Sequence, residues 1–263
     1  MTRLQSRPAT EVLVATRGEV SPAAPDYART KLHAVLERLD EPVLAARVKL
    51  TQEANHAVAR PSIAQAVIDL NGRPVRAQVA ATTMQEAVDL LQDRLNARIA
   101  RVRTHRRHHH RHHAETPAVV PAPTGQEHRP QRRALGVEER RVVRHKTYSL
   151  ARQTGWSAVF ELEAMDYDFH LYTDTETGHE SVVHRDAATG EYRITSAGTT
   201  PDTDPGLPVT AAGAPALTVA EAAARLDLGG LPFVFFTDAA TGRGNVLYHR
   251  YDGHYGLITP VDQ

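Results

Sequence analysis

Arginine is the residue type whose spacing in this sequence most suggests a chemical role. Arg94, Arg98 and Arg101 are four and three positions apart, which places three side chains on one flank of a helix. An arginine fork pairs with two phosphate oxygens and fixes position without reading bases, although an ordinary solvated helix face would show the same stripe. Basic residues on other predicted elements favour binding to an RNA backbone. The candidate RNA contacts are Arg29, Lys31, Arg38, Arg47, Lys49, Arg73, Arg76, Arg94, Arg98, Arg101 and Arg103.

A cluster of histidines follows this stripe, at His108, His109, His110, His112 and His113. Imidazoles ligate metal ions, but ligands without a preformed scaffold and supporting hydrogen bonds bind metals weakly. Residues 104–140 lack apolar periodicity and are rich in His, Pro and Arg, which predicts a disordered linker. We therefore expect a tether whose arginines touch RNA, and no metal site.

The sequence shows no motif typical of catalysis. Gly242-Arg243-Gly244 is expected in a hairpin and not at a strand-to-helix turn, so it does not predict a nucleotide-binding loop. The chain has no cysteine, which excludes disulfides and thiolate metal sites. We expect no enzymatic activity, no cofactor and no small-molecule substrate.

A βαβββα unit over residues 11–103 must position the basic residues of the N-terminal half. Asn71-Gly72 is a favoured hairpin dipeptide, and it separates strands expected over 62–70 and 73–81. The last helix, capped by Thr82 or Thr83, runs to about residue 103 and has an apolar stripe. That stripe is Val88, Leu91, Leu95, Ile99 and Val102. Strands over 11–15 and 43–51 and a helix over 27–39 complete an α+β unit that is similar to double-stranded-RNA-binding folds, which recognise shape.

The C-terminal half contains one motif twice, 64 residues apart. Thr173-Asp174-x-x-Thr177-Gly178 recurs as Thr237-Asp238-x-x-Thr241-Gly242. Around each motif, runs of aromatic and β-branched residues separated by turn formers predict three antiparallel strands. A helix is expected before each set of strands, so each copy forms a small (β)αβββ domain. Ser157 is a possible cap of the first helix, over 156–165, and Thr218 with Glu221 forms a capping box for the second. A leading strand is expected over 142–148; its counterpart, at best 207–210, is missing or borrowed.

The second copy resembles the C-terminal domain of long-form ribosome hibernation promoting factors, the S30AE or sigma-54 modulation family. The resemblance is carried by Thr241-Gly242, residues 245–248 (Asn-Val-Leu-Tyr), Asp252-Gly253 and residues 255–260 (Tyr-Gly-Leu-Ile-Thr-Pro). The first copy departs from this pattern at Ser181, His184 and residues 192–195. Two tandem copies are similar to an actinobacterial dormancy-associated subgroup, and residues 11–103 resemble the family's N-terminal domain.

This resemblance implies a function in ribosome hibernation. The N-terminal domain would bind the 30S subunit across the tRNA and mRNA path at the A and P sites, with the basic residues above as contacts to 16S rRNA. In the long-form family the C-terminal domain homodimerises and joins two 70S ribosomes into a 100S particle. Candidate residues for pairing of the copies are Phe233, Phe235, Val246, Tyr248, Tyr255, Phe169, Tyr172 and Val182.

The tandem copies leave two outcomes open. About 20 residues join the copies, which gives a millimolar effective concentration for pairing within one chain. An intramolecular pseudo-dimer would hold 70S monosomes idle, whereas self-association of the second copy between chains would form 100S particles. A non-ribosomal RNA-binding module and a regulator acting through protein contacts are the alternatives from other functional classes.

The zero net charge of the chain hides an asymmetry between its halves. Residues 1–140 hold 22 Lys/Arg and 15 Asp/Glu, whereas residues 141–263 hold 9 and 16, so the halves carry +7 and −7. This pattern suggests a half that faces a polyanion and a half that faces a protein. The expected organisation is an N-terminal domain (1–103), the linker (104–140), the first copy (141–197), a second linker (198–216) and the second copy (217–263). Without a long apolar run or a signal peptide, a cytoplasmic protein with no membrane partner is expected.

Overall fold

The protein is described by a computed structural model that covers residues 10–55, 58–109, 128–186, 189–198 and 209–261. The chain divides into two compact units, which we describe separately. Unit 1 comprises residues 1–106, 125–131 and 164–166, and unit 2 comprises the remainder. No helix in these covered ranges is both long enough and apolar enough to cross a membrane.

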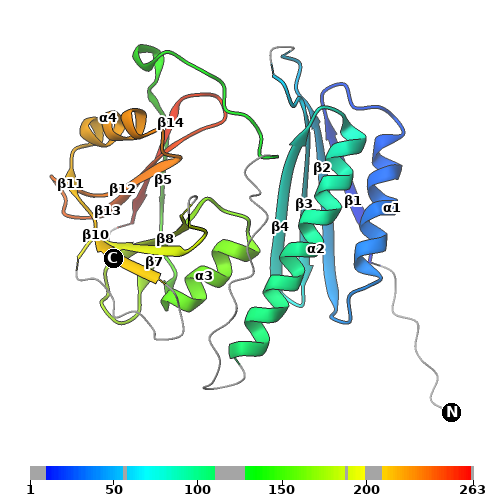
Figure 1. Ribbon diagram of the computed structural model, residues 1–263, viewed down its shortest axis with the longest axis horizontal. Coiled ribbons are helices and arrows are strands. Elements are labelled where there is room, and N and C mark those ends of the chain that lie inside the picture. Colours follow the sequence, from blue (N-terminus) through cyan, green and yellow to red (C-terminus); the bar gives the residue numbers. More distant parts are fainter. Residues whose placement is uncertain (1–9, 56–57, 110–127, 187–188, 199–208, 262–263) are drawn as a thin grey trace. The chain divides into compact units, whose positions relative to one another are not determined.

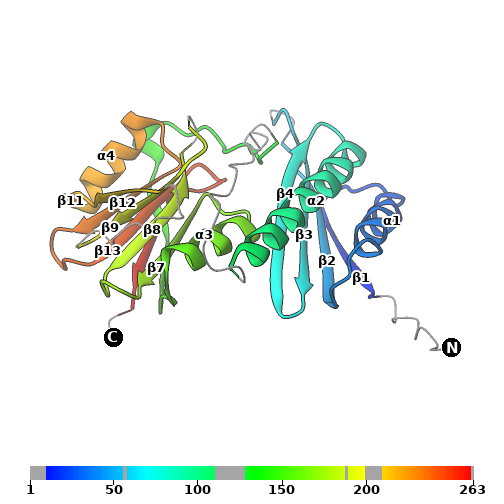
Figure 2. The ribbon, with the colours of Figure 1, turned by 60° about the horizontal axis from the view of Figure 1, so that its bottom comes forward.

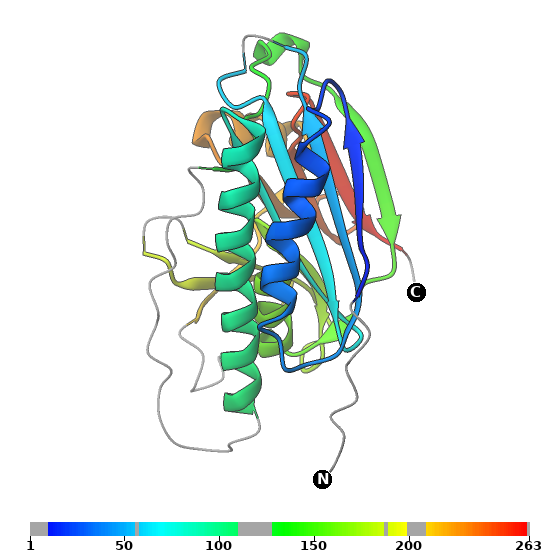
Figure 3. The same cartoon turned by 90° about the vertical axis from the view of Figure 1, so that its right-hand side faces the viewer.

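Unit 1 is a four-stranded sheet with two helices on one face, as Figure 3 shows for α1 (blue) and α2 (teal). Its elements are β1 (Val12–Arg17), α1 (Ala24–Leu36), β2 (Val43–Gln52), β3 (Ser62–Leu70), β4 (Arg73–Ala81) and α2 (Met84–His109). The strands follow the order β1-β2-β3-β4. Strands β1 and β2 are parallel because α1 connects them, and the other neighbours are antiparallel. The predicted βαβββα order is confirmed.

Local sequence signals explain the bounds of these elements. Asn71 and Gly72 both have positive φ, 53° and 84°, as the predicted type I′ turn requires. The Thr83 hydroxyl accepts a hydrogen bond from the Glu86 backbone N–H at 3.2 Å, which caps α2. All five residues of the predicted apolar stripe of α2 are buried. The helix continues to His109, so residues 104–109 extend it beyond the predicted end.

Unit 2 contains the two repeated copies, and their elements correspond at a spacing of 64 residues, or 63 for the last strand. The first copy has β6 (Arg152–Gln153), α3 (Gly155–Ala164), β7 (Phe169–Asp174), β8 (Glu180–Arg185) and β9 (Tyr192–Ser196). The second has β11 (Ala216–Leu217), α4 (Val219–Gly229), β12 (Phe233–Asp238), β13 (Gly244–His249) and β14 (Tyr255–Pro260). The antiparallel three-stranded core of each copy is confirmed.

Each copy receives its outermost strand from the chain segment that precedes the other copy. Strand β5 (Val142–Tyr148), which precedes the first copy, pairs in parallel with β14 of the second. Strand β10 (Val209–Gly213), which precedes the second copy, pairs in parallel with β9 of the first. The second leading strand is therefore present, and the two leading strands are exchanged. Arg140, just before β5, forms an ion pair of 2.6 Å with Asp227 on α4 and anchors this exchange.

Three apolar clusters show that the two sheets pack face to face. One cluster contains residues from both sheets and none from the helices: Leu150, Leu171, Val182, Phe233, Phe235, Val246 and Ile258. The other two clusters lie between each sheet and its own helix, α3 or α4. The order helix, sheet, sheet, helix can be followed in Figures 1 and 2.

The helices of the copies begin at capping residues. Thr218 and Glu221 form the predicted capping box at α4, since each side chain binds the other residue's backbone N–H. In the first copy, the Thr154 hydroxyl accepts from the Ser157 backbone N–H at 3.3 Å. Thr154 is therefore the cap, and the expectation for Ser157 was wrong because the helix begins one residue earlier, at Gly155.

Candidate RNA-binding faces and the pairing surface of the copies

The neighbouring flanks of α1 and α2 meet at an ion pair. The Lys31 ammonium lies 2.7 Å from Oδ1 of Asp89 on α2 and 5.2 Å from the centre of the Tyr27 ring. The Tyr27 hydroxyl donates to the same carboxylate at 2.7 Å. Hydrogen bonding to Asp89 raises the pKa of Lys31, and the bond from Lys31 lowers the pKa of Asp89. The ion pair joins Lys31 to an acidic residue of α2, so it does not place the basic residues of the two helices side by side.

Arg94 and Arg98 converge on one carboxylate of unit 1. Nη2 of Arg98 lies 2.6 Å and Nη2 of Arg94 lies 2.9 Å from Oδ1 of Asp166, and the two arginine side chains are each only 12% exposed. Burial alone would raise the pKa of Asp166, but Arg98, Arg94 and Arg129 outweigh it and lower the pKa. An ordinary solvated flank would leave these guanidinium groups in water. Two forks directed at one anionic oxygen are also the arrangement that binds a phosphate.

The remaining basic residues of the helices differ in their partners. Arg29 pairs with Asp26 at 2.5 Å, and Arg103 lies 3.7 Å from Glu41. Arg38 is exposed and Arg101 is half-buried. Acidic neighbours therefore partly compensate the charge of the helical face.

A second basic surface lies on the opposite face of the sheet. Strand pairing aligns Arg47 on β2 with Val67 on β3 and Arg76 on β4, and Lys49 follows two residues after Arg47 on the same face. The Arg76 guanidinium donates to the amide oxygens of Gln78 and Gln65, at 2.6 and 3.4 Å. In the part of the chain that the structure covers, no acidic side chain pairs with Arg47, Lys49 or Arg76.

The predicted RNA contacts are thus divided between two faces of unit 1. Arg29 and Lys31 belong to α1, and Arg94, Arg98, Arg101 and Arg103 belong to α2. The helix predicted over 27–39 ends at Leu36, so Arg38 lies in the turn after it. Arg47, Lys49 and Arg76 belong to the open face of the sheet. Arg73 is exposed beside the Asn71-Gly72 turn. A single phosphate backbone cannot contact both faces at one point, so the two groups define separate candidate surfaces.

The predicted pairing residues mostly lie between the two sheets of unit 2. Phe233, Phe235, Val246 and Val182 are in the shared cluster, and Phe169 and Tyr248 pack against it. The contacts are reciprocal: Phe169 lies 4.5 Å from its repeat equivalent Phe233, ring centre to ring centre. Tyr248 contacts Phe169 at 6.1 Å, and its equivalent His184 contacts Phe233 at 5.3 Å. Equivalent residues that exchange contacts characterise a two-fold arrangement.

Two residues of the predicted pairing set face the other way. Tyr172 lies in the cluster beneath α3, and Tyr255 lies in the cluster beneath α4. The Tyr255 hydroxyl donates to Asp227 at 2.6 Å, and burial together with this carboxylate raises the pKa of Tyr255 to about 12. Strand alternation could have predicted that Tyr172 and Tyr255 lie on the sheet face opposite the pairing face. Tyr172 is an odd number of residues from Phe169, and Tyr255 pairs with His249 and not with Tyr248.

Sequence reasoning missed several residues of the pairing surface. Leu150, Leu171 and Ile258 belong to the shared cluster. Glu180 and Arg243 form an ion pair of 2.7 Å between the copies. Leu171 could have been found from alternation with Phe169 along β7, whereas no local signal pairs Glu180 with Arg243.

The expectations about metals and nucleotides concern two further segments. Across the residues that the structure covers, no group of three or more His, Cys, Asp or Glu side chains could hold a metal ion. Of the histidine cluster, His108 and His109 are in α2, and His110, His112 and His113 lie outside the covered ranges. Gly242-Arg243-Gly244 lies where β12 turns into β13, in the predicted hairpin.

Comparison with known proteins assigns both units to one family. Residues 13–107 match the model described as sigma 54 modulation protein / S30EA ribosomal protein. Residues 137–194 and 210–257 each match the C-terminal model of the same description. The two C-terminal matches correspond to the two copies of unit 2.

Individual relatives are similar over between 35% and 82% of the chain. A dormancy associated translation inhibitor of Mycobacterium tuberculosis is 37% identical over 226 residues, which is 82% of this chain and 76% of that protein. A ribosome hibernation promotion factor of the same organism is 30% identical over 173 residues, or 60% of this chain and 78% of that protein. The solved structure of a ribosomal subunit interface protein from Coxiella burnetii is 23% identical, with a TM-score of 0.30 over 35% of this chain and 97% of that chain. With the matched models covering most of the sequence, this chain belongs to the sigma 54 modulation/S30EA ribosomal protein family.

Proposed function

We propose that this protein is a ribosome hibernation factor that binds the 30S subunit of idle 70S ribosomes across the tRNA and mRNA path, at the A and P sites. Occupation of that path inhibits translation and protects the ribosome under stress or dormancy. The observation that carries the proposal is the order of the family matches, one N-terminal domain followed by two C-terminal domains. The name of the 37% identical relative, a translation inhibitor associated with dormancy, supports the same function.

The chemistry of unit 1 suits a ribosomal partner. Guanidinium groups that converge on a carboxylate, as Arg94 and Arg98 do, can instead take a phosphate oxygen of 16S rRNA. Such contacts recognise the shape of the RNA backbone and carry no base specificity. Neighbouring 30S proteins complete the contact, and ribosome binding places the protein in the cytoplasm. The role requires no catalytic group and no cofactor.

Pairing of the copies within one chain favours 70S monosomes as the product. The apolar face that would join a second chain is covered by the other copy, through the cluster that includes Phe233 and Val182. The exchange of β5 and β10 ties the copies together further. A chain whose pairing face is already occupied has no equivalent face with which to join two ribosomes.

Sedimentation of purified 70S ribosomes with the full-length protein tests this proposal. We expect the protein to migrate with the 70S peak and to inhibit translation in a reconstituted system, without a 100S peak. A 100S peak would refute the monosome outcome and favour dimerisation through the second copy. Failure to co-sediment with 30S or 70S particles at modest ionic strength would refute ribosome binding itself.

A further inference from the structure

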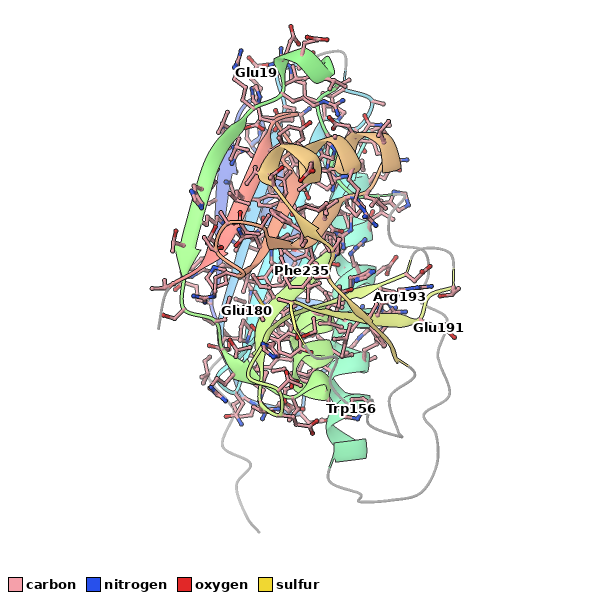
Figure 4. The ribbon with its side chains drawn as sticks, turned by 90° about the vertical axis from the view of Figure 1, so that its left-hand side faces the viewer. Glu19, Trp156, Glu180, Glu191, Arg193 and Phe235 are labelled. Atoms are coloured by element: carbon pink, nitrogen blue, oxygen red, sulfur yellow. The ribbon has the colours of Figure 1, made fainter. Side chains whose placement is uncertain are left out.

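The two copies are not equivalent at the point where their sheets come closest. Glu180 is the first residue of β8, and Gly244, 64 residues later, is the first residue of β13. A Cβ atom added at Gly244 would lie 2.8 Å from Cβ of Glu180, 2.8 Å from Cζ of Phe235 and 3.0 Å from Cβ of Ala197. Figure 4 labels Glu180 and Phe235 at this contact. Glycine is required here by lack of space, because real Cβ atoms do not approach other atoms so closely.

The same contact joins opposite charges. Nε and Nη2 of Arg243 each lie 2.7 Å from a carboxylate oxygen, Oε1, of Glu180. The side chains are 27% and 15% exposed, so the ion pair is shielded from water more than a surface pair. The residue equivalent to Arg243 in the first copy is His179. The first copy therefore contributes a carboxylate to this contact, and the second contributes a guanidinium with a space beside it.

We propose that Glu180 and the Arg243-Gly244 dipeptide are specificity determinants, which make the pairing surface accept the other copy of the same chain and reject a like copy. The partner of this surface is a copy with a cation and a glycine at the two facing positions. The contacts belong to unit 2 alone. Only the consequence for ribosome pairing rests on the proposed function.

The two like pairings fail for different physical reasons. In a pair of first copies, a second Glu180 would occupy the place of Gly244, with colliding Cβ atoms and two carboxylates together. In a pair of second copies, two glycines would leave space, but each Arg243 would lose its carboxylate. The first pairing is excluded by collision and repulsion, and the second is weakened by the missing ion pair. Specificity of this kind combines an attractive contact with a repulsive one.

Only a modest preference for the unlike copy is needed to keep pairing within one chain. A linker of about 20 residues gives an effective concentration on the order of millimolar. At about 100 µM chain, pairing within the chain therefore has only about a tenfold advantage over pairing between chains. An ion pair that distinguishes the copies adds to this advantage, and a repulsive substitution can reverse it.

The test uses the full chain and measures its mass in solution by light scattering at about 100 µM. The wild type is expected at the monomer mass, 28.9 kDa. Glu180→Arg places two cations at the contact of the first and second copies but leaves the pair of second copies unaltered, so we expect a shift toward about twice the monomer mass. The swap Glu180→Arg with Arg243→Glu restores opposite charges and should return the mass to the monomer. Glu191→Arg, the same charge change at an exposed site of the first copy, should remain monomeric.

Several results would overturn the proposal. It fails if Glu180→Arg stays monomeric with the wild-type melting temperature, or if the swap does not restore the monomer. Should Glu180→Arg aggregate, the milder pair Glu180→Gln and Arg243→Gln replaces it. Each single variant is then expected to lower the melting temperature by about 3 °C and the double variant by no more than one of them; additive losses would refute the coupling. Ribosome binding enters none of these measurements, so failure of the proposed function would leave their outcome unchanged.

Discussion

At the N-terminus of α4, two side chains satisfy two backbone donors that the helix itself leaves unpaired. The Thr218 hydroxyl accepts from the Glu221 N–H at 3.2 Å, and the Glu221 carboxylate accepts from the Thr218 N–H at 2.8 Å. The bonds that the Glu221 carboxylate accepts from the Thr218 N–H and from the Thr218 hydroxyl lower the pKa of Glu221, because they favour its charged form. The motif sets where α4 begins and is readable from four consecutive residues.

We expect Thr218→Ala to destabilise unit 2 by about 1 kcal/mol, the usual loss for an N-cap threonine. Thermal unfolding of the full chain gives the stability, and hydrogen exchange at the Glu221 amide reports the lost cap directly. Arg225→Ala, at an exposed position of the same helix, is the matched control and should change stability by less than about 0.5 kcal/mol. Equal effects of the two substitutions would contradict a role of the cap.

Basic side chains are placed on one flank of helix α2 by the helical repeat and on one face of the sheet by the alternation of strand residues. One face of α2 is buried through Val88, Leu91 and Leu95, which leaves Arg94 and Arg98 on the adjoining flank. In the strands, every second residue points away from the helices, so Arg47 and Arg76 emerge on the open face. The element therefore decides which basic residues can act together.

We expect reversal of Arg94, Arg98 and Arg101 to glutamate to abolish binding to 30S particles at modest ionic strength. Reversal of Arg47, Lys49 and Arg76 should weaken binding and lower the slope of log K against log salt by about 2 to 3, because about three phosphate contacts are lost. Filter binding over a salt series measures both effects.

Two controls accompany this comparison. Reversal of the exposed cations Arg144, Arg152 and Arg225 of unit 2 matches the charge change and should leave binding to 30S particles nearly intact. Because the side chains of Arg94 and Arg98 are only 12% exposed, glutamine at the three α2 positions provides a milder form if reversal prevents folding. Full binding by the α2 variants would show that the helical stripe does not contact RNA.

At the scale of the whole molecule, acidity and basicity are separated between the halves of the chain. Unit 2 also holds half-buried histidines, which do not contribute to the net charge counted above. Burial lowers the pKa of His170, His184 and His249. His184 lies at the pairing surface against the Phe233 ring, where Arg193 lowers its pKa further and Asp186 opposes the shift.

These shifts predict that unit 2 is less stable in mild acid. The folded pKa values lie below the unfolded value of about 6.5, so the unfolded chain binds more protons and stability rises with pH. The contribution is complete above about pH 6.5 and is lost as pH falls through the folded values. Calorimetry at pH 7.5 and 5.5 should show a lower melting temperature of unit 2 at pH 5.5.

Substitution of His184 tests the assignment of this pH effect. His184→Phe keeps an aromatic ring against Phe233 and removes the titrating group, so it should reduce the pH dependence. His145→Phe, at an exposed histidine, should retain the full dependence. A melting temperature of unit 2 that rises on acidification would contradict the sign of the histidine shifts.

Short-range signals allowed much of the fold and part of the candidate site to be predicted. The Asn71-Gly72 turn, the Thr218 capping box and the apolar stripe of α2 depend on residues within a few positions of one another, so local sequence determines them. The 64-residue repeat likewise shows that unit 2 contains two similar sheets. The basic residues of α2 follow from the same periodicity as its core.

Contacts between distant residues were decided only by the tertiary structure. Exchange of β5 and β10 depends on which sheet edge each strand reaches, and both edges accept a parallel strand with the same backbone hydrogen bonds. The carboxylate of Asp166 facing Arg94 and the contact of Glu180 with Arg243 join residues more than 60 positions apart. By itself the sequence determined the elements, the duplication and the family, because periodicity and turn chemistry are local; which copy receives which strand, and which charges meet, depends on packing that no local pattern encodes.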